Sequence, residues 1–339
     1  MTDYKRRIGT AIATVAILAN AATPAAFAGT TISITNNGAD SDNDVQVNNT
    51  QNTNVTQNNS ANFTNNVSGD ANTGDNDANK NNGGDVSVKT GDASINATVV
   101  NQANTNHASV DCCDQGNTTV KIGGNAADSN NTVNLDVDKD IDIDQDNDAD
   151  FDNNIKYLDA KTGNNDAKKN NGGDVSIETG DASVKVAVSN WANANSARVG
   201  GNGNQASMSL MIVKNGADSD NDITVDVDSD IDLDQDNYAD FDNRIDGDSN
   251  TGDNDANKNN GGAVEIETGD ASVDVTVDNM ANFNWADLNC GCVFGNGGLT
   301  VDVSENGPDS DNNVNGDFDN DQDVDQDNDA DFDTNVKNS

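Results

Sequence analysis

Short clusters of aspartate at alternate positions are the residues of this chain best suited to chemistry. The segment Asp40–Asp44 reads DSDND, the same letters return at Asp218–Asp222, and DSDNN stands at Asp309–Asn313. Alternating oxygen ligands open the calcium loop of an EF-hand. The match then ends, because valine or isoleucine stands where that loop needs glycine, and its final glutamate is missing. The pattern indicates calcium ligation without indicating an EF-hand.

A second acidic loop, TGDNDANKNNGG, occupies residues 73–84 and again 251–262. It also spaces carboxylates and amides at alternate positions. The alternative for both kinds of loop is an Asx-turn, in which the side chain binds its own backbone and no metal. The candidate calcium ligands are Asp40, Asp42, Asp44, Asp75, Asp77, Asp128, Asp218, Asp220, Asp222, Asp253, Asp255, Asp309 and Asp311.

No pattern typical of an enzyme accompanies these loops. His107 is the only histidine, and the chain has no GxSxG, HExxH or phosphate-binding loop. Carboxylate pairs occur throughout, so that no single pair indicates acid–base catalysis. We therefore expect a protein that is not an enzyme.

The charge of the chain restricts its partners. The formal net charge is −43, and only four of the 60 acidic residues are glutamate. Such a charge argues against nucleic acid and anionic membranes as direct partners and favours divalent cations. The preference for aspartate favours turns, side-chain ladders and metal loops, which need a short carboxylate. Composition alone would also fit an intrinsically disordered chain.

An internal repeat argues against disorder. Asp40 returns as Asp128, Asp218 and Asp309, at spacings of 88, 90 and 91 residues, and Phe63 recurs at the same spacings. A copied unit of this kind usually stacks on its neighbours, because one repeat can seldom bury its own apolar face. Repeat proteins of this kind are more often structural than catalytic.

Each repeat contains a long alternating segment. From residue 136 to residue 152 every even position is aspartate, whereas the odd positions are mostly apolar, with glutamine and asparagine among them. This strict period of two predicts a strand of roughly 20 residues with one face inward. The inward glutamine and asparagine predict either hydrogen-bonded ladders between layers or a corner. Those positions are Gln57, Asn59, Gln145, Asn147, Gln235, Asn237, Gln326 and Asn328.

Shorter strands follow in the second half of each repeat. Val175 and Ile177 are inward at odd positions, but after Thr179-Gly180-Asp181 the apolar positions become even, which indicates a turn between two strands. We predict an all-β repeat protein, either a β-solenoid or stacked β layers. Tandem β-sandwich domains are the alternative, because one repeat has about the length of an immunoglobulin domain.

Stacking the acidic strands in register would place aspartate over aspartate. At a strand spacing of about 4.8 Å, each pair costs roughly 0.9 kcal/mol even in water. Summed over a strand, this cost approaches the stability of a typical domain, about 5–15 kcal/mol. Bound calcium is the expected compensation.

The first repeat keeps the alternation but not the charge. Its outward positions from Gln46 to Asn62 are all amides or hydroxyls, whereas the partial fourth repeat is rich in aspartate. We therefore hypothesise head-to-tail assembly, in which the last half-repeat of one copy meets the first repeat of the next and a filament grows. The alternative is that the neutral strand is merely a cap.

The cysteines occur in two pairs. Cys112 and Cys113 are adjacent, and Cys290 and Cys292 are separated by one glycine. In a secreted chain they are disulfide candidates, either within each pair or between neighbouring copies.

Residues 1–28 have the features of a secretory signal peptide. Lys5, Arg6 and Arg7 precede an apolar stretch, and Ala26-Phe27-Ala28 is a small-x-small cleavage site. Losing this segment, whose net charge is +2, would change the formal net charge from −43 to about −45. We expect a secreted, extracellular or cell-surface protein that does not insert into a membrane after cleavage. The predicted division is a signal peptide at 1–28, repeats at 29–118, 119–208 and 209–297, and a half repeat at 298–339.

The spacing Gln-x-Asn-x-Ala within alternating strands resembles that of curlin repeats, the subunits of bacterial surface amyloid. The unit here is longer, lacks the glycine after glutamine, and carries aspartate on its outward face. The resemblance implies surface fibres. We therefore predict a structural protein that assembles with itself head to tail into fibres or a surface coat, stabilised by calcium. A calcium-dependent adhesin and a disordered, ion-binding or mineral-nucleating polymer are the alternatives.

Overall fold

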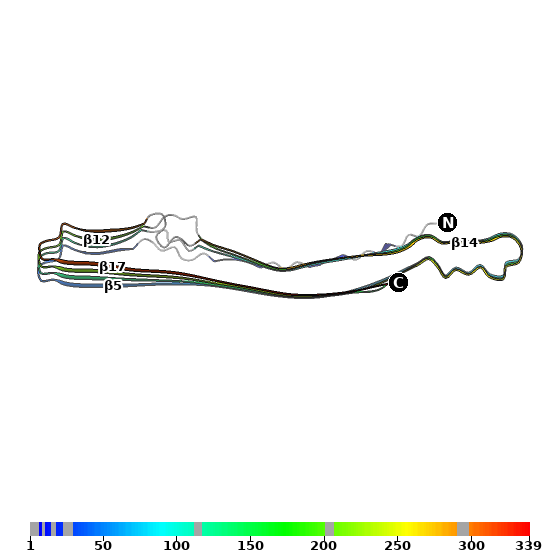
Figure 1. Ribbon diagram of the computed structural model, residues 1–339, viewed down its shortest axis with the longest axis horizontal. Coiled ribbons are helices and arrows are strands. Elements are labelled where there is room, and N and C mark those ends of the chain that lie inside the picture. Colours follow the sequence, from blue (N-terminus) through cyan, green and yellow to red (C-terminus); the bar gives the residue numbers. More distant parts are fainter. Residues whose placement is uncertain are drawn as a thin grey trace.

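The protein is a flat stack of parallel β-strands in which equivalent strands of successive repeats lie above one another (Figure 1). The computed structural model describes residues 30–111, 117–200, 207–289 and 298–339, together with the backbone of three short strands within the first 29 residues. All the strands pair in parallel. This confirms the prediction of an all-β solenoid of stacked layers, and the alternative of tandem β-sandwiches is not observed.

The long strands of the four repeats form one sheet, here called the long sheet, in the order β17-β13-β9-β5. Each long strand has 28 to 32 residues and exceeds the expected 20, because the alternation continues beyond the aspartate run on both sides. The strands are β5 (Asp42–Asn72), β9 (Asn130–Lys161), β13 (Asp220–Asn250) and β17 (Asp311–Asn338).

The chain then reverses and returns along the opposite side of the layer (Figure 1). The strands β7 (Ala93–Val110), β11 (Ala182–Gly200) and β15 (Ala271–Asn289) form the central part of this side, here called the return sheet. Two smaller sheets flank it. One contains β6 (Val86–Lys89), β10 (Val175–Glu178) and β14 (Val264–Glu267), and the other contains β4 (Thr31–Thr35), β8 (Thr118–Gly123), β12 (Met208–Val213) and β16 (Leu299–Ser304).

The phase change predicted at the TGD turn is confirmed. Val175 and Ile177 of β10 are buried, and the buried positions of β11 are then Ala182, Val184 and the even positions after them. The turn between the two strands therefore shifts the inward positions from odd to even residue numbers. The apolar side chains of β10 then pack on Ala78, Ala167 and Ala256 of the polar loops, whereas those of β11 pack on the long sheet.

The core is the narrow space between the two sides of each layer. Separate apolar clusters fill it along the strands, and aromatic rings form a column in one of them. Phe63 stacks on Phe151 with ring centroids 5.0 Å apart, Phe151 on Phe241 at 4.8 Å, and Phe241 approaches Phe332 at 5.2 Å. The repeat spacing of phenylalanine thus reflects one ring per layer.

The second layer carries one extra residue. The pairing of β9 with β5 and β13 shifts after Ile155, where Lys156 and Tyr157 take the place of the single residue Asp246 of β13. Tyr157 has a positive φ of 59° and is 78% exposed. This is a β-bulge, which was not predicted although the inward positions change from odd at Ile155 to even at Leu158 across it.

Three short strands of the predicted signal peptide lie along the first layer. The strands β1 (Arg7–Ile8), β2 (Ala11–Thr14) and β3 (Leu18–Ala22) pair with the edge of β7 that β11 leaves free. The side chains of this segment lie outside the described residues, and its role in secretion stays a prediction. Within the described part, no helix is long and apolar enough to span a membrane.

Candidate assembly interface

Columns of aspartate cover the outer face of the long sheet. Asp144 of β9 pairs in register with Asp234 of β13, which pairs with Asp325 of β17. The same holds for most outward positions between residues 136 and 152. The equivalent strands are in register, and aspartate therefore stacks on aspartate.

These columns raise the pKa of several of their members. The pKa values of Asp142, Asp144, Asp234, Asp236 and Asp240 are raised above the usual value, first by loss of hydration and then by neighbouring aspartates along the strand and in the adjacent layers. For Asp234 the charged neighbours include Asp236 and Asp325. The carboxylates of this face therefore repel one another, and bound protons or cations would reduce that repulsion.

The first layer ends these columns without adding charge. On β5, Asn54 donates from Nδ2 to Oδ2 of Asp142 at 3.1 Å, and Asn62 donates to Oδ2 of Asp150 at 2.8 Å. An amide nitrogen has two N–H donors and no negative charge. A neutral strand next to an acidic one thus replaces repulsion with hydrogen bonds.

Both ends of the stack present strand edges with no partner among the described residues. The edge of β5 away from β9 is open, as is the edge of β17 away from β13. Inward-facing groups on the last layers are consequently exposed, including Phe332 at 47% and Ile266 of β14 at 45%. Unpaired edges with exposed apolar groups are sites of strand addition.

Side-chain amides form buried columns inside the stack, and most of them point the same way. Asn43 donates to Asn131 at 2.9 Å, Asn131 donates to Asn221 at 2.9 Å, and Asn221 donates to Asn312 at 2.9 Å. The columns that begin at Asn59, Asn65, Asn101 and Asn104 also donate toward the later repeats. The stack therefore has a direction that distinguishes its two ends.

The predicted glutamine and asparagine ladders are observed, and the corner alternative is wrong. Gln145 donates to Gln57 at 2.6 Å, Gln235 donates to Gln145 at 2.7 Å, and these side chains lie in the middle of long strands. The sequence did not show that asparagines of the return sheet join the same network. Asn147 donates to Asn195 at 2.6 Å and Asn106 donates to Asn147 at 3.1 Å, which ties the two sides of the layer together.

The first group of predicted calcium ligands stacks at one corner of the layers. Asp40, Asp128, Asp218 and Asp309 all have positive φ, between 52° and 58°. Aspartate tolerates this backbone conformation well, which gives these residues a role in the turn. The backbone N–H of Asp128 donates to the carbonyl of Ala217 at 3.0 Å, so the corners are linked from layer to layer.

The residues just after this corner begin the long strands. Asp42 pairs with Asn130, and Asp220 pairs with Asn130 on one side and Asp311 on the other. Asp44 pairs with Thr132 and Asp222 pairs with Asn313, whose amide donates to Oδ1 of Asp222 at 3.2 Å. Amide and hydroxyl neighbours thus separate several of these carboxylates.

Three of the second group of predicted ligands, Asp75, Asp253 and Asp255, already have side-chain partners within the protein. Asp75 accepts from Asn164 and from Asn72, and these hydrogen bonds lower its pKa. Asp253 accepts from Asn250 at 3.0 Å. Asp77 and Asp255 lie in one column with Asp166 between them, and Lys168 lies 2.7 Å from Asp255 and 2.9 Å from Asp166.

Among the residues that the structure describes, no group of three or more His, Cys, Asp or Glu side chains is arranged to hold a metal ion. Calcium at either loop stays a prediction. Cys112, Cys113, Cys290 and Cys292 lie outside the described residues, and their pairing also stays a prediction. His107 lies on the outer face of the return sheet, with Nδ1 3.2 Å from Oγ of Ser196.

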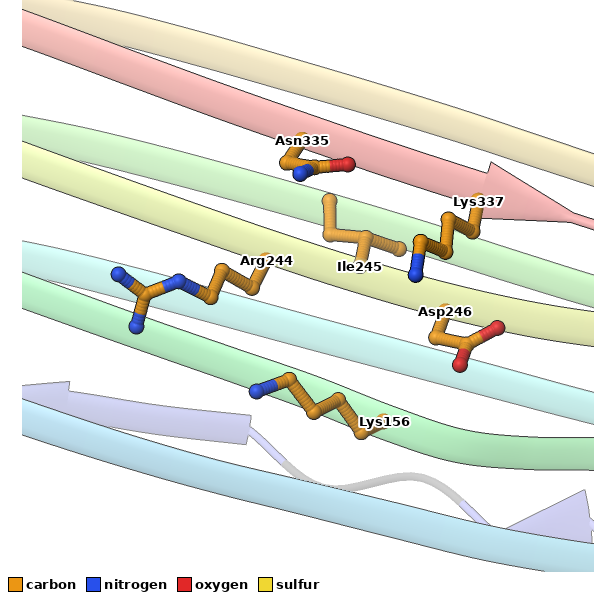
Figure 2. Close-up of a pocket in the computed structure, with 6 residues that line it drawn as sticks. All are labelled: Lys156, Arg244, Ile245, Asp246, Asn335 and Lys337. Carbon is orange, nitrogen blue, oxygen red and sulfur yellow. The ribbon is translucent and has the colours of Figure 1, made fainter.

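A small basic pocket interrupts the acidic face at the bulge of β9 (Figure 2). Lys156, Arg244 and Lys337 come from three successive layers and line it together with Ile245, Asp246 and Asn335. Arg244 pairs with Asp242 and lies 3.8 Å from Asp152, and Lys156 donates to Asn154 at 3.0 Å. Arg244 therefore neutralises nearby aspartates, and alternation alone did not reveal this pocket.

No protein-family model matches this sequence, and neither a curated protein nor a solved structure matches it. The stacked parallel layers with buried asparagine ladders are consistent with the resemblance to curlin repeats at the level of the fold.

Proposed function

We propose that this protein is a structural rather than catalytic protein whose copies join head to tail into fibres or a surface coat. In the proposed joint, β17 of one copy pairs with β5 of the next, in the register that β9 and β13 have within the stack. The fold supports a structural or fibre-forming role, because the layers repeat along one axis and the outer edges of β5 and β17 have no partner among the described residues.

The observation that carries this proposal is the use of the β5 amides. Asn54 and Asn62 each donate one N–H to an aspartate of β9. In the proposed register, their second N–H would face the equivalent aspartates of β17, which are Asp323 and Asp331. Each amide would then lie between two carboxylates and donate to both. A neutral strand thus separates two acidic ones.

The direction of the stack supports head-to-tail contact. Head-to-tail addition continues the amide columns and the phenylalanine column, since Phe332 would approach Phe63 of the next copy. Joining two β17 edges would instead place aspartate over aspartate. It would also break the parallel pairing found in every layer.

Calcium and location complete the proposal. Aspartate columns with raised pKa values favour a bound cation, and extracellular calcium is abundant enough to serve. A signal peptide at residues 1–28 would deliver the protein to that environment. We accordingly propose a secreted, cell-surface polymer that binds divalent cations, and not nucleic acid or membrane.

Adding charge to β5 tests the joint directly. The triple variant Asn52→Asp, Asn54→Asp and Thr56→Asp gives β5 the residues that stand at these register positions in β9, namely Asp140, Asp142 and Asp144. Electron microscopy should show fibres of the parent chain and none of the triple variant. The control changes the same three residues to serine and should keep the fibres. Fibres from the triple aspartate variant would overturn the proposed joint.

Calcium is tested separately, by dialysing the parent chain against about millimolar calcium or against a chelator. Fibres only with calcium would support both the assembly and the cation. Fibres in both samples would retain the assembly and reject a calcium requirement.

A further inference from the structure

The two outer faces of the molecule differ sharply in charge. On the long sheet, the section from residue 146 to residue 150 and its register partners in β13 and β17 present eight aspartates and Tyr238. Directly behind this section lies the middle of the return sheet, as the contact of Asn147 with Asn195 shows. Its outward residues over the same three layers carry no aspartate, glutamate, lysine or arginine.

Four large apolar side chains stand on that uncharged part of the return sheet. Trp191 is 49% exposed, Met280 61%, Phe283 61% and Trp285 42%. Trp191 and Met280 pair in register, whereas Phe283 and Trp285 follow on β15. We call these four residues the apolar patch. Their neighbours along β11 are buried, which shows that these positions point outward rather than into the core.

Four of the charges near the patch form two ion pairs, whereas Asp278, two residues before Met280 on β15, adds one negative charge to the same face. Lys185 lies 3.5 Å from Asp274, and Arg198 lies 3.7 Å from Asp287, each pair joining adjacent layers on the return sheet. The outer face of the return sheet is therefore close to neutral on a molecule whose formal net charge is −43. A neutral face with exposed aromatic side chains has the character of an interface.

We propose that the apolar patch binds the apolar patch of a second copy, so that two molecules pack back to back through their return sheets. The charge distribution favours a second copy as the partner. Back-to-back packing buries the nearly neutral return sheets of both copies and leaves both aspartate-covered long sheets in water. The contact is lateral and differs from the head-to-tail joint, and in a fibre it would pair two filaments.

The face is large enough for a specific contact. Eighteen residues of β7 extend over about 60 Å at roughly 3.3 Å per residue, and three strands cover about 14 Å. The resulting area of roughly 850 Å² matches the ~800 Å² per partner of a standard interface. Trp191 lies on the central strand of this face and Trp285 on its outermost strand β15, and tryptophan is one of the residue types that dominate binding energy.

The test replaces each residue of the patch by a residue that the protein itself carries at the same register position in another layer. The patch variant carries Trp191→Gln and Met280→Gln after Gln102, Phe283→Thr after Thr105, and Trp285→Ser after Ser196. The control, Tyr238→Asp, removes an aromatic side chain from the opposite face, where Asp148 and Asp329 are its register partners. The patch variant and the control are both made in the chain that also carries Asn52→Asp, Asn54→Asp and Thr56→Asp. Head-to-tail joining then does not contribute to self-association.

Sedimentation equilibrium then measures self-association. We expect a monomer–dimer equilibrium that the control leaves unchanged, and a dissociation constant at least tenfold higher for the patch variant, equivalent to about 1.4 kcal/mol. Raising salt should strengthen the dimer, since the contact is apolar and the remaining charges repel. The proposal would be overturned if the triple aspartate chain without further changes remained a monomer at about 100 µM. It would also be overturned if the patch variant dimerised as well as the control.

If the triple aspartate chain still forms long polymers, the head-to-tail joint is wrong. The patch is then judged by whether filaments of the patch variant are single where those of the control are paired.

Discussion

At the scale of single residues, the buried amides determine which side chains the stack tolerates. Asn153 uses its full capacity, because it accepts from Asn65 at 2.8 Å and Asn101 at 2.9 Å and donates to Asn190 at 3.2 Å and Asn243 at 2.8 Å. Its removal leaves buried donors and acceptors without partners. We expect Asn153→Ala to lower the free energy of unfolding by about 2–4 kcal/mol.

Denaturant unfolding followed by circular dichroism measures this loss. The outward neighbour Asn154 is the control, and Asn154→Ala should change stability by less than about 0.5 kcal/mol. Equal effects of the two substitutions would mean that the amide columns contribute little.

The aspartate columns predict how stability depends on pH. Their raised pKa values mean that the folded state binds protons more tightly than the unfolded state. The associated stability is present at low pH and is lost as pH rises through the folded-state pKa values. In the absence of calcium, we therefore expect the melting temperature to rise as pH falls from 7 toward about 4.

Asp234→Asn provides the matched comparison, because it interrupts a column between Asp144 and Asp325. The variant should melt at a higher temperature than the parent at pH 7 and show a smaller gain on acidification. A parent that loses stability as pH falls toward 4 would contradict this account of the columns.

At the scale of elements, strict alternation predicted the long strands and their inward faces, because period two has only one structural solution over so many residues. The phase change after the TGD turn was also predictable from sequence. The extra residue of β9 was not predicted, although the inward positions change from odd at Ile155 to even at Leu158, which is its signal in the sequence. The basic pocket was missed because its cations come from three repeats and meet only after the layers stack.

The bulge itself leads to a prediction for β9. Deleting Tyr157 would give β9 the same spacing as β5 and β13 and would remove a bulky residue from a positive φ, which costs roughly 1–2 kcal/mol. We expect the deletion to raise the free energy of unfolding by about that amount. Tyr157→Gly keeps the bulge but relieves the backbone, and should recover about half of the gain. A deletion that destabilises the protein would show that the bulge contributes to packing.

At the scale of the whole molecule, the long sheet has four strands, whereas the return sheet has only β7, β11 and β15. Strands β16 and β17 lie above β12 and β13, whereas β14 and β15 have no strand above them in the part that the structure describes. When β17 pairs with β5 of the next copy, β15 and β7 are left two strand spacings apart, about 9.6 Å. Only β1–β3 lie along that edge of β7, so a chain without residues 1–28 has a gap there.

Closing this gap should bend the fibre. A difference of one strand spacing, about 4.8 Å, across sheets roughly 10 Å apart tilts each copy by about 25° toward the return sheet. We expect fibres of residues 29–339 to curve with the long sheet on the convex side.

Further deletion of residues 298–339 leaves three strands in each sheet, and β13 can then meet β5 while β15 meets β7. That chain should form straight fibres, and restoring residues 1–28 to the longer chain should also reduce its curvature. The measurement is fibre curvature in electron micrographs. Curved fibres from residues 29–339 would mean that β15 and β7 of successive copies have moved together. Straight fibres would contradict this, because another strand would then have to lie between β15 and β7.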